Sequence, residues 1–346
     1  MTRVLDVRDL RVSFPTADGR RFHPVDGVSF TLHRGETLAL VGESGCGKSL
    51  TSLALLRLVP PPGRVDPGSV VRLGDTDVLA LEREALRRIR GRRIGMIFQD
   101  PMTSLNPVFT AGDQIAEGIR AHFRISKAEA RERALRLLQE VGIPDPAERL
   151  DAYPHQLSGG MRQRVMIAIA LAAEPEILVA DEPTTALDVT VQAQILEVLD
   201  QLRRSRGMAV LLITHDLGIV AGRADRVAVM YAGQIVEEAE TAELFANPSH
   251  PYTQGLFASV PRISGPLRRL TPIRGTVPPP AEWPTGCRFR PRCPQAFEKC
   301  VLAPEPLPVG PGHRMRCWLA EPDAASPTRR EPVRATSAQP ERSGGD

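Results

Sequence analysis

Residues 42–49 read Gly42-Glu43-Ser44-Gly45-Cys46-Gly47-Lys48-Ser49, and this stretch fits the pattern G-x-x-x-x-G-K-[ST]. It follows the apolar run Leu38-Ala39-Leu40-Val41, which predicts a buried strand that leads into a loop. The three glycines allow the backbone to curl until successive N–H groups point at one place, and a helix beginning near Lys48 adds the positive end of its dipole. The stretch therefore predicts a phosphate-binding loop between a strand and a helix.

The side chains of this loop suit a nucleotide. Lys48 is expected to reach the β- and γ-phosphates of ATP, and Ser49 is expected to ligate Mg²⁺. Cys46 stands at a variable position of the pattern and supplies its backbone N–H, so a thiol of no special role is the simpler interpretation. The residues expected to contact the nucleotide here are Gly42, Glu43, Ser44, Gly45, Cys46, Gly47, Lys48, Ser49 and Leu50.

Two later apolar runs also end in polar residues. The run Ile177-Leu178-Val179-Ala180 is typical of a buried parallel strand, and it ends in Asp181 and Glu182. Asp181 is suited to hold Mg²⁺ through water, and Glu182 is suited to polarise the water that attacks the γ-phosphate. The third run, residues 209–214, ends at His215, which is expected to contact the γ-phosphate and that water.

Length and charge limit the class of protein. With 346 residues the chain exceeds what one hydrophobic core usually supports, so a nucleotide domain with an appended region is the simplest division. A net charge of +3 is too small to indicate a nucleic-acid partner. The sequence has no apolar run near the roughly 20 residues that cross a bilayer, and its first residues are polar rather than a signal peptide. We therefore expect a soluble chain that reaches a membrane only through partners.

A further stretch, Leu157-Ser158-Gly159-Gly160-Met161, completes a set of motifs that resembles one family. Together the motifs are similar to those of the ATP-binding subunits of ABC transporters, over about residues 4–245. The chain pattern predicts the corresponding α/β fold. Strand-like runs before the phosphate loop predict an antiparallel edge sheet, alternating strands and helices predict a parallel core, and helical periodicity over about residues 100–155 predicts an inserted helical subdomain.

The resemblance implies roles for several residues outside the loop. Gln99 would sense the γ-phosphate and Mg²⁺ and relay this to the membrane partner. Ser158, Gly159 and Gly160 would face the phosphates bound to the opposite subunit of a head-to-tail dimer, and Ser158 suits the N-cap of the following helix in any case. Ala186-Leu187-Asp188 resembles the loop by which the two subunits touch. Phe14 is similar in position to the aromatic residue that stacks on adenine, with Phe22 as the alternative.

Two more stretches narrow the resemblance to the oligopeptide and dipeptide importer group. They are Ile97-Phe98-Gln99-Asp100-Pro101-Met102-Thr103-Ser104-Leu105-Asn106-Pro107 and Ser249-His250-Pro251-Tyr252-Thr253-Gln254-Gly255-Leu256. The group implies two ATPases beneath two membrane permeases, with an external binding protein that delivers the peptide.

Four of the five cysteines lie close together in the sequence, at Cys287, Cys293, Cys300 and Cys317. A reduced cytosolic chain favours metal binding over disulfides for such a set, although the C-x₂₋₄-C pairs typical of zinc are absent. Four thiolates also suit an iron–sulfur cluster. Some members of the peptide-importer group carry such a set, and in them a [4Fe-4S] cluster is implied. Zinc and a metal-free module remain the alternatives.

The resulting expectation is an ATP-hydrolysing subunit that energises peptide import at the cytoplasmic face of the inner membrane. Its partners would be a second, non-identical ATPase and two permeases. An importer ATPase for nickel or another small solute, and an ABC ATPase that acts on DNA or ribosomes, are the alternative functions. The expected divisions are a nucleotide-binding domain over 1–248, a cysteine-containing module over 249–324 and a disordered tail over 325–346.

Overall fold

The computed structural model describes residues 2–100, 104–185, 187–259 and 272–321. The expected tail after residue 324, the stretch 101–103 and Ala186 lie outside the described residues. Within the described ranges, no helix is long and apolar enough to cross a membrane.

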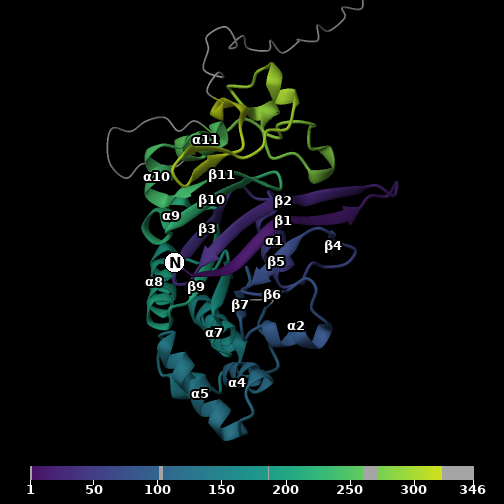
Figure 1. The fold of residues 1–346 in the computed structure, drawn as a ribbon. Helices are drawn as coiled ribbons and strands as arrows, with labels where there is room; N and C mark the ends of the chain where they lie inside the picture. Colours follow the sequence, from purple (N-terminus) through teal and green to yellow (C-terminus); the bar gives the residue numbers. More distant parts are fainter. Residues whose placement is uncertain (1, 101–103, 186, 260–271, 322–346) are drawn as a thin grey trace, which may run out of the picture.

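An eight-stranded sheet forms the centre of the molecule, in the order β12-β13-β11-β10-β3-β9-β8-β7 (Figure 1). Five of its strands, β10, β3, β9, β8 and β7, are parallel, and their carboxyl ends meet at one edge. Strands β3, β8 and β9 are the three apolar runs of the sequence. In this order the eight strands span Leu307–Gly310, His313–Met315, Gln234–Glu240, Arg226–Tyr231, Thr37–Val41, Ala209–Thr214, Ile177–Asp181 and Ile94–Ile97.

A smaller antiparallel sheet packs against one face of the central sheet, as the strand-like runs before the phosphate loop predict. Its strands β1, β2, β4, β5 and β6 span Arg3–Pro15, Arg21–His33, Arg64–Val65, Val70–Leu73 and Thr76–Asp77. The two sheets share an apolar core with helix α1, Lys48–Leu55, which follows the phosphate loop. This core fixes the position of the loop, because α1 cannot move without disturbing both sheets.

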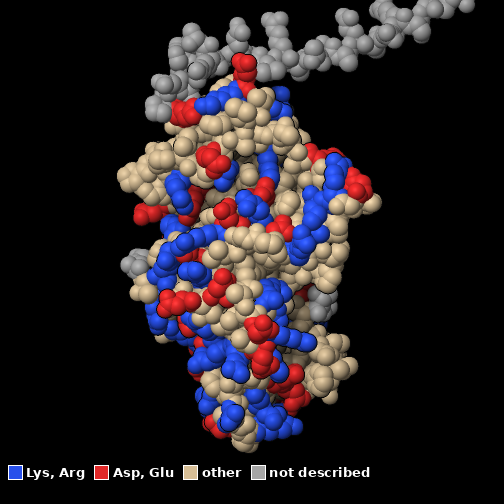
Figure 2. All heavy atoms as spheres, turned by 45° about the vertical axis from the view of Figure 1, so that its right-hand side comes forward, with Lys and Arg blue, Asp and Glu red and all other residues tan. Residues whose placement is uncertain are grey.

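Helices cover the other side and build the inserted subdomain at the lower end of Figure 1. The predicted helical stretch contains α4 (Ala111–His122), α5 (Lys127–Glu140) and α6 (Pro146–Arg149). Helices α4 and α5 pack with α7 (Gly159–Leu171) in one apolar core. Charges of both signs are interspersed over this end of the molecule on the face drawn in Figure 2. Helix α5 carries two ion pairs between residues one turn apart. Three further helices before the C-terminal region are α2 (Arg83–Ile89), α8 (Val189–Arg206) and α9 (Leu217–Arg223).

The C-terminal region forms the upper end of the molecule in Figure 1. It begins with α10 (Thr241–Ala246) and α11 (Pro251–Ser259), and continues as short 3₁₀ turns around the cysteines. Its hairpin β12–β13 pairs with β11 and so extends the central sheet. Tyr252, Phe289 and Cys300 share an apolar core with strands β3 and β10. The C-terminal region is therefore joined to the central sheet by strand pairing and by a shared apolar core.

Candidate active site

The phosphate loop lies between β3 and α1, as its sequence predicts, and its glycines are required by close packing. The backbone at Gly42 and Gly47 has φ of 156° and 106°. A Cβ on Gly42 would lie 2.2 Å from the carbonyl oxygen of Met230, and one on Gly47 would lie 2.4 Å from that of Pro24. Only glycine fits such positions, so the loop is locked into a single conformation.

Lys48 and Ser49 begin helix α1 with their functional atoms close to the loop and the acidic strand end. The buried ammonium of Lys48 donates to the carbonyl oxygens of Gly42 (2.8 Å) and Glu43 (3.1 Å). The hydroxyl of Ser49 donates to Asp181 Oδ1 over 3.1 Å. A cation held by the loop carbonyls and a hydroxyl paired with a carboxylate therefore lie on consecutive residues next to the loop.

A cavity of about 460 Å³ opens beside the loop. Phe14 and Phe22, whose rings are nearly parallel with centroids 5.9 Å apart, both line it, so the expected adenine-stacking residue and its alternative share one cavity. Gln99 and Glu182 line the same cavity. The cavity also has a wall that the sequence motifs do not indicate, since Pro280 of the C-terminal region lines it. The full lining is Phe14, Phe22, Pro24, Ser44, Gly45, Gly47, Lys48, Ser49, Leu50, Gln99, Glu182 and Pro280.

Asp181 ends strand β8 in a buried position. Its two carboxylate oxygens accept hydrogen bonds from Ser49 and from Ser52, the latter over 3.2 Å. Burial raises the pKa of Asp181, and the neighbouring charge of Glu182 adds to this, while the two serine hydroxyls oppose it. A buried acid of this kind gains most from a bound cation, so Asp181 and Ser49 form a donor pair that fits Mg²⁺.

Glu182 is surrounded by three polar side chains from separate parts of the chain. Its carboxylate accepts hydrogen bonds from Gln99 Nε2 (3.0 Å) and Thr185 Oγ1 (2.9 Å), and lies 3.2 Å from His215 Nδ1. Burial alone would raise the pKa of Glu182, but the hydrogen bonds from Thr185 and His215 and the charge of Lys48 lower it. The carboxylate is therefore ionised at neutral pH and able to accept a proton. Thr185 is the member of this group that sequence reasoning missed.

Ser158, Gly159 and Gly160 lie apart from this cavity, at the exposed start of α7. Ser158 caps the helix as expected, since its hydroxyl accepts the N–H of Met161 over 3.3 Å. Asp188 caps α8 in the same way, with the N–H of Val191 at 2.9 Å. The serine and glycine motif thus presents an open helix N-terminus away from the nucleotide site of its own chain.

The four C-terminal cysteines come together in one cluster. The N–H of Cys287 donates to the carbonyl oxygen of Cys300 over 3.0 Å, which joins two of the loops. Burial, with a smaller contribution from the neighbouring thiols, raises the pKa of Cys293 and of Cys317 to about 12. Among the described residues, however, no three or more His, Cys, Asp or Glu side chains are arranged to hold a single metal ion. The structure therefore gives no support to the expected metal site.

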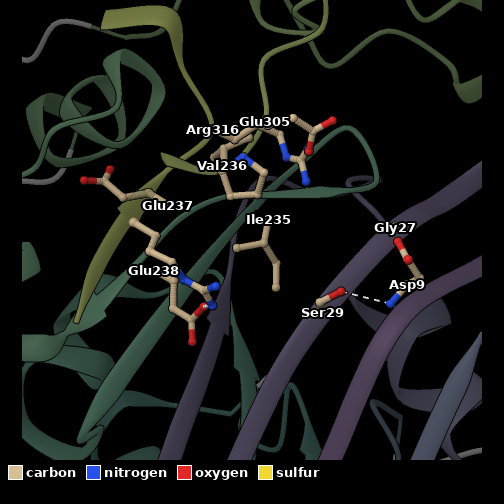
Figure 3. A pocket seen from close by; sticks show the side chains of 11 residues that line it. Asp9, Gly27, Ser29, Ile235, Val236, Glu237, Glu238, Glu305 and Arg316 are labelled. Carbon is tan, nitrogen blue, oxygen red and sulfur yellow. Dashed lines mark hydrogen bonds and ion pairs between the residues drawn. The ribbon is translucent and has the colours of Figure 1, made fainter. Parts of the chain in front are cut away.

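A second hollow, of about 260 Å³, lies between the central sheet and the C-terminal region (Figure 3). It is lined by charges that pair with one another. Arg314 donates to Glu238 over 3.0 Å, and Arg316 lies 3.6 Å from Glu305. We assign no ligand to it, because these internal pairs already compensate the charges.

Two family descriptions match the chain. Residues 25–185 match the family described as ABC transporter, and residues 236–300 match the one described as oligopeptide/dipeptide transporter, C-terminal region. The dipeptide transport ATP-binding protein DppD of Bacillus subtilis is 51% identical over 323 residues, which cover 93% of this chain and 96% of that protein. The oligopeptide transport ATP-binding protein AppD of the same organism is 50% identical over 329 residues, covering 94% and 99%.

The fold is also similar to that of a solved ATP-binding cassette. The dimeric structure of its post-hydrolysis state, bound to ADP and Pi, has a TM-score of 0.60 and 27% identity, and the similarity covers 68% of this chain and 98% of that one.

Proposed function

The chain belongs to the ATP-binding subunits of ABC transporters in the oligopeptide and dipeptide group, and from that premise we propose that it hydrolyses ATP to energise peptide import across the cytoplasmic membrane. The observation that carries the proposal is the convergence of Asp181, Glu182, Gln99 and His215 on the loop that holds Lys48 and Ser49. Hydrolysis of a γ-phosphate requires groups that bind the phosphates and, next to them, an ionised carboxylate that orients the attacking water.

Each residue has a distinct part in this proposal. The N–H groups of the loop and the ammonium of Lys48 bind the β- and γ-phosphates. Ser49 and Asp181, with Gln99, would hold Mg²⁺, which neutralises charge on the phosphates. Glu182 orients the attacking water and accepts its proton, and His215 stabilises the water and the γ-phosphate beside it. Phe14 or Phe22 stacks on the adenine.

The open end of α7 supports a dimer in which each site is completed by the other subunit. Ser158, Gly159 and Gly160 lie outside the cavity of their own chain, and a helix N-terminus suits the phosphates held by a partner. The partners we propose are a second, non-identical ATPase and two permeases. An external binding protein would deliver the peptide to the permeases. The chain would then work at the cytoplasmic face of the membrane, closing on ATP and opening after hydrolysis.

Uptake of labelled solutes by cells tests this function. A strain without this chain is complemented by the wild type or by Lys48→Ala, and uptake of a labelled dipeptide, an oligopeptide and nickel is measured. Restored peptide uptake with the wild type alone supports the proposal. Restored nickel uptake without peptide uptake would assign the chain to the small-solute alternative. If the wild type restores uptake of none of the three solutes and the chain co-purifies with ribosomes or DNA, the transport proposal is wrong.

We further infer that Cys287, Cys293, Cys300 and Cys317 hold a [4Fe-4S] cluster. The support is the donor set, since four thiols share one mostly buried module, and burial raises the pKa of Cys287, Cys293 and Cys317 so that these three stay protonated unless a cation compensates. A cluster also keeps its thiolates farther apart than a single ion does, because its own iron and sulfide atoms lie between them. When bound, it would staple a module that has little regular secondary structure.

Iron content decides between the three interpretations of the cysteines. Protein purified without oxygen should contain about four irons per chain and absorb in the visible range. Cys300→Ser should lose the iron, whereas Cys46→Ser, which changes the thiol outside the module, should keep it. Colourless, iron-free wild-type protein would contradict the cluster, and stoichiometric zinc in its place would favour the zinc alternative.

A further inference from the structure

The phosphate loop is held from outside by an arginine of the cysteine module. Arg292, adjacent to Cys293, forms a two-pronged ion pair with Glu43, the second residue of the loop. Its two terminal nitrogens lie 2.7 and 3.0 Å from the two carboxylate oxygens of Glu43. The side chain of Arg292 is only 5% exposed. Two parallel, charge-assisted hydrogen bonds in a largely buried position fix the relative orientation of the guanidinium and the carboxylate.

Arg292 is itself positioned by the module. Its Nε donates to the carbonyl oxygen of Arg274 over 2.9 Å, and a terminal nitrogen donates to that of Gly275 over 3.0 Å. Its guanidinium lies over the ring of Tyr231, 5.7 Å from the centroid. The arginine therefore presents one fixed orientation to the loop, and that orientation depends on the fold of residues 272–300.

A second contact from the C-terminal region holds the backbone of the same loop residue. The N–H of Glu43 donates to the hydroxyl of the buried Tyr252, on α11, over 2.9 Å. The carbonyl of Glu43 in turn accepts a hydrogen bond from Lys48. A continuous series of contacts thus runs from Arg292 through Glu43 to the lysine that is expected to bind the phosphates.

Charge gives this contact a second effect. Glu43 places a carboxylate in a loop whose proposed ligand carries several negative charges, and an unpaired carboxylate there would repel that ligand. The guanidinium of Arg292 neutralises it at contact distance. Loss of the arginine therefore both loosens the loop and leaves a repulsive charge beside the phosphates.

We propose that Arg292 is a positioning residue of the nucleotide site, through which the cysteine module sets the affinity of the phosphate loop for ATP. The proposal rests on the proposed ATP hydrolysis and adds a partner within the chain to it. Coupling of this kind is reciprocal, so bound ATP should also stabilise the module. Arg292 is not among the residues that line the cavity beside Glu182, so its effect should appear in binding rather than in the hydrolysis step.

The test compares full-length variants by equilibrium binding of a fluorescent ATP analogue and by steady-state hydrolysis. Arg292→Ala should raise Kd and KM for ATP by roughly 5- to 150-fold, the usual range of coupling between sites, with kcat at saturating ATP close to that of the wild type. Arg292→Lys keeps the charge without the two-pronged geometry and should lie in between. The control, Arg314→Ala, removes another ion pair that joins the module to the central sheet, with Glu238, and should leave Kd unchanged.

The double variant Arg292→Ala with Glu43→Gln separates positioning from general damage. Because it removes the carboxylate that the arginine neutralises, its Kd should be closer to the wild-type value than that of Arg292→Ala. Equal Kd values for wild type, Arg292→Ala and Arg292→Lys would overturn the proposal, as would effects of Arg292→Ala and Glu43→Gln that simply add. If Arg292→Ala does not fold, Arg292→Lys decides alone, and a Kd equal to that of the wild type overturns the proposal. A wild type that fails to bind ATP would instead overturn the proposed function itself.

Discussion

Glu182 occupies a backbone conformation that a residue with a side chain rarely adopts. Its φ of 47° costs on the order of 1–3 kcal/mol. Hydrogen bonds stabilise this strained conformation. The N–H of Glu182 donates to the carbonyl oxygen of Ile213 on the neighbouring strand over 2.9 Å, and the carboxylate of Glu182 accepts hydrogen bonds from Gln99 and Thr185. Such fixed geometry aims the proposed base at the cavity before any nucleotide binds.

Gly47 gives a prediction at the same scale. In Gly47→Ala the new Cβ meets the backbone of Pro24 at a positive φ, so the loop must open. We expect affinity for ATP to fall at least tenfold and the free energy of unfolding to fall by about 1–3 kcal/mol. The matched control is Gly222→Ala on α9, where a Cβ meets nothing within 4 Å and φ lies outside the strained range. Isothermal titration and urea unfolding measure both effects, and equal behaviour of the two variants would contradict the packing argument.

Among the elements, α7 combines a structural cap with the proposed contact to a partner's nucleotide. Its first residues are glycines, and a Cβ on Gly160 would lie 2.7 Å from Val191 of the neighbouring helix α8. Ser158 and Gly159 remain exposed beside this contact between the two helices. An element that begins with Ser-Gly-Gly can therefore present its N–H groups outward while its remaining turns stay packed in the core.

Two caps of the same kind separate these roles. Ser158→Ala and Ser126→Ala each remove a hydroxyl that accepts a backbone N–H at the start of a helix, α7 and α5 respectively. Each should lower the free energy of unfolding by about 1 kcal/mol. Only Ser158→Ala should also reduce ATP hydrolysis by the assembled transporter, because the proposed dimer places only α7 beside the partner's nucleotide. A comparable loss of hydrolysis in both variants would mean that Ser158 acts through stability alone.

At the scale of the whole molecule, the C-terminal region joins the sheet and the core of the nucleotide-binding fold. The buried Glu237 on β11 links them, since it accepts the backbone N–H groups of Ser249 and His250 and lies 2.8 Å from Nε2 of His313 on β13. Damage in the module is therefore expected to reach the phosphate loop through the shared core as well as through Arg292.

His250, at the start of this region, predicts a dependence of stability on pH. Burial lowers its pKa to about 3, from an ordinary value of 6.5, and its Nδ1 accepts the N–H of Tyr252. Between these two values the unfolded chain binds a proton that the native chain does not. The free energy of unfolding should therefore fall, by up to about 1.4 kcal/mol per pH unit, as the pH drops below about 6.5.

The comparison with His250→Asn isolates this group, because the asparagine can accept the same hydrogen bond without titrating. Near neutral pH the wild type should be the more stable of the two, and its advantage should shrink as the pH is lowered toward 4. Urea unfolding over a pH series measures the difference. A constant difference across the series would show that His250 does not titrate as its burial requires.

The sequence predicts the parts of this molecule that depend on local signals. The phosphate loop, the strands that end in Asp181 and His215, and the cap at Ser158 each follow from residues within a few positions of one another. The pairing of Arg292 with Glu43 spans 249 positions and leaves no periodic trace. The addition of β13 to the central sheet also could not be predicted, because a strand of three residues is too short to show an alternating pattern. Long-range contacts of the C-terminal region therefore required the structure.

The most direct test of the account is the hydrolysis of ATP by Glu182→Gln in the assembled transporter, with ATP binding measured on the same preparation. Glutamine keeps the size of the side chain and a hydrogen-bond acceptor for Gln99, but it cannot take a proton from water. The account predicts a loss of roughly 10²- to 10⁴-fold in hydrolysis with ATP affinity retained. Hydrolysis at the wild-type rate would contradict the assignment of Glu182 as the base and, with it, the central claim for this site.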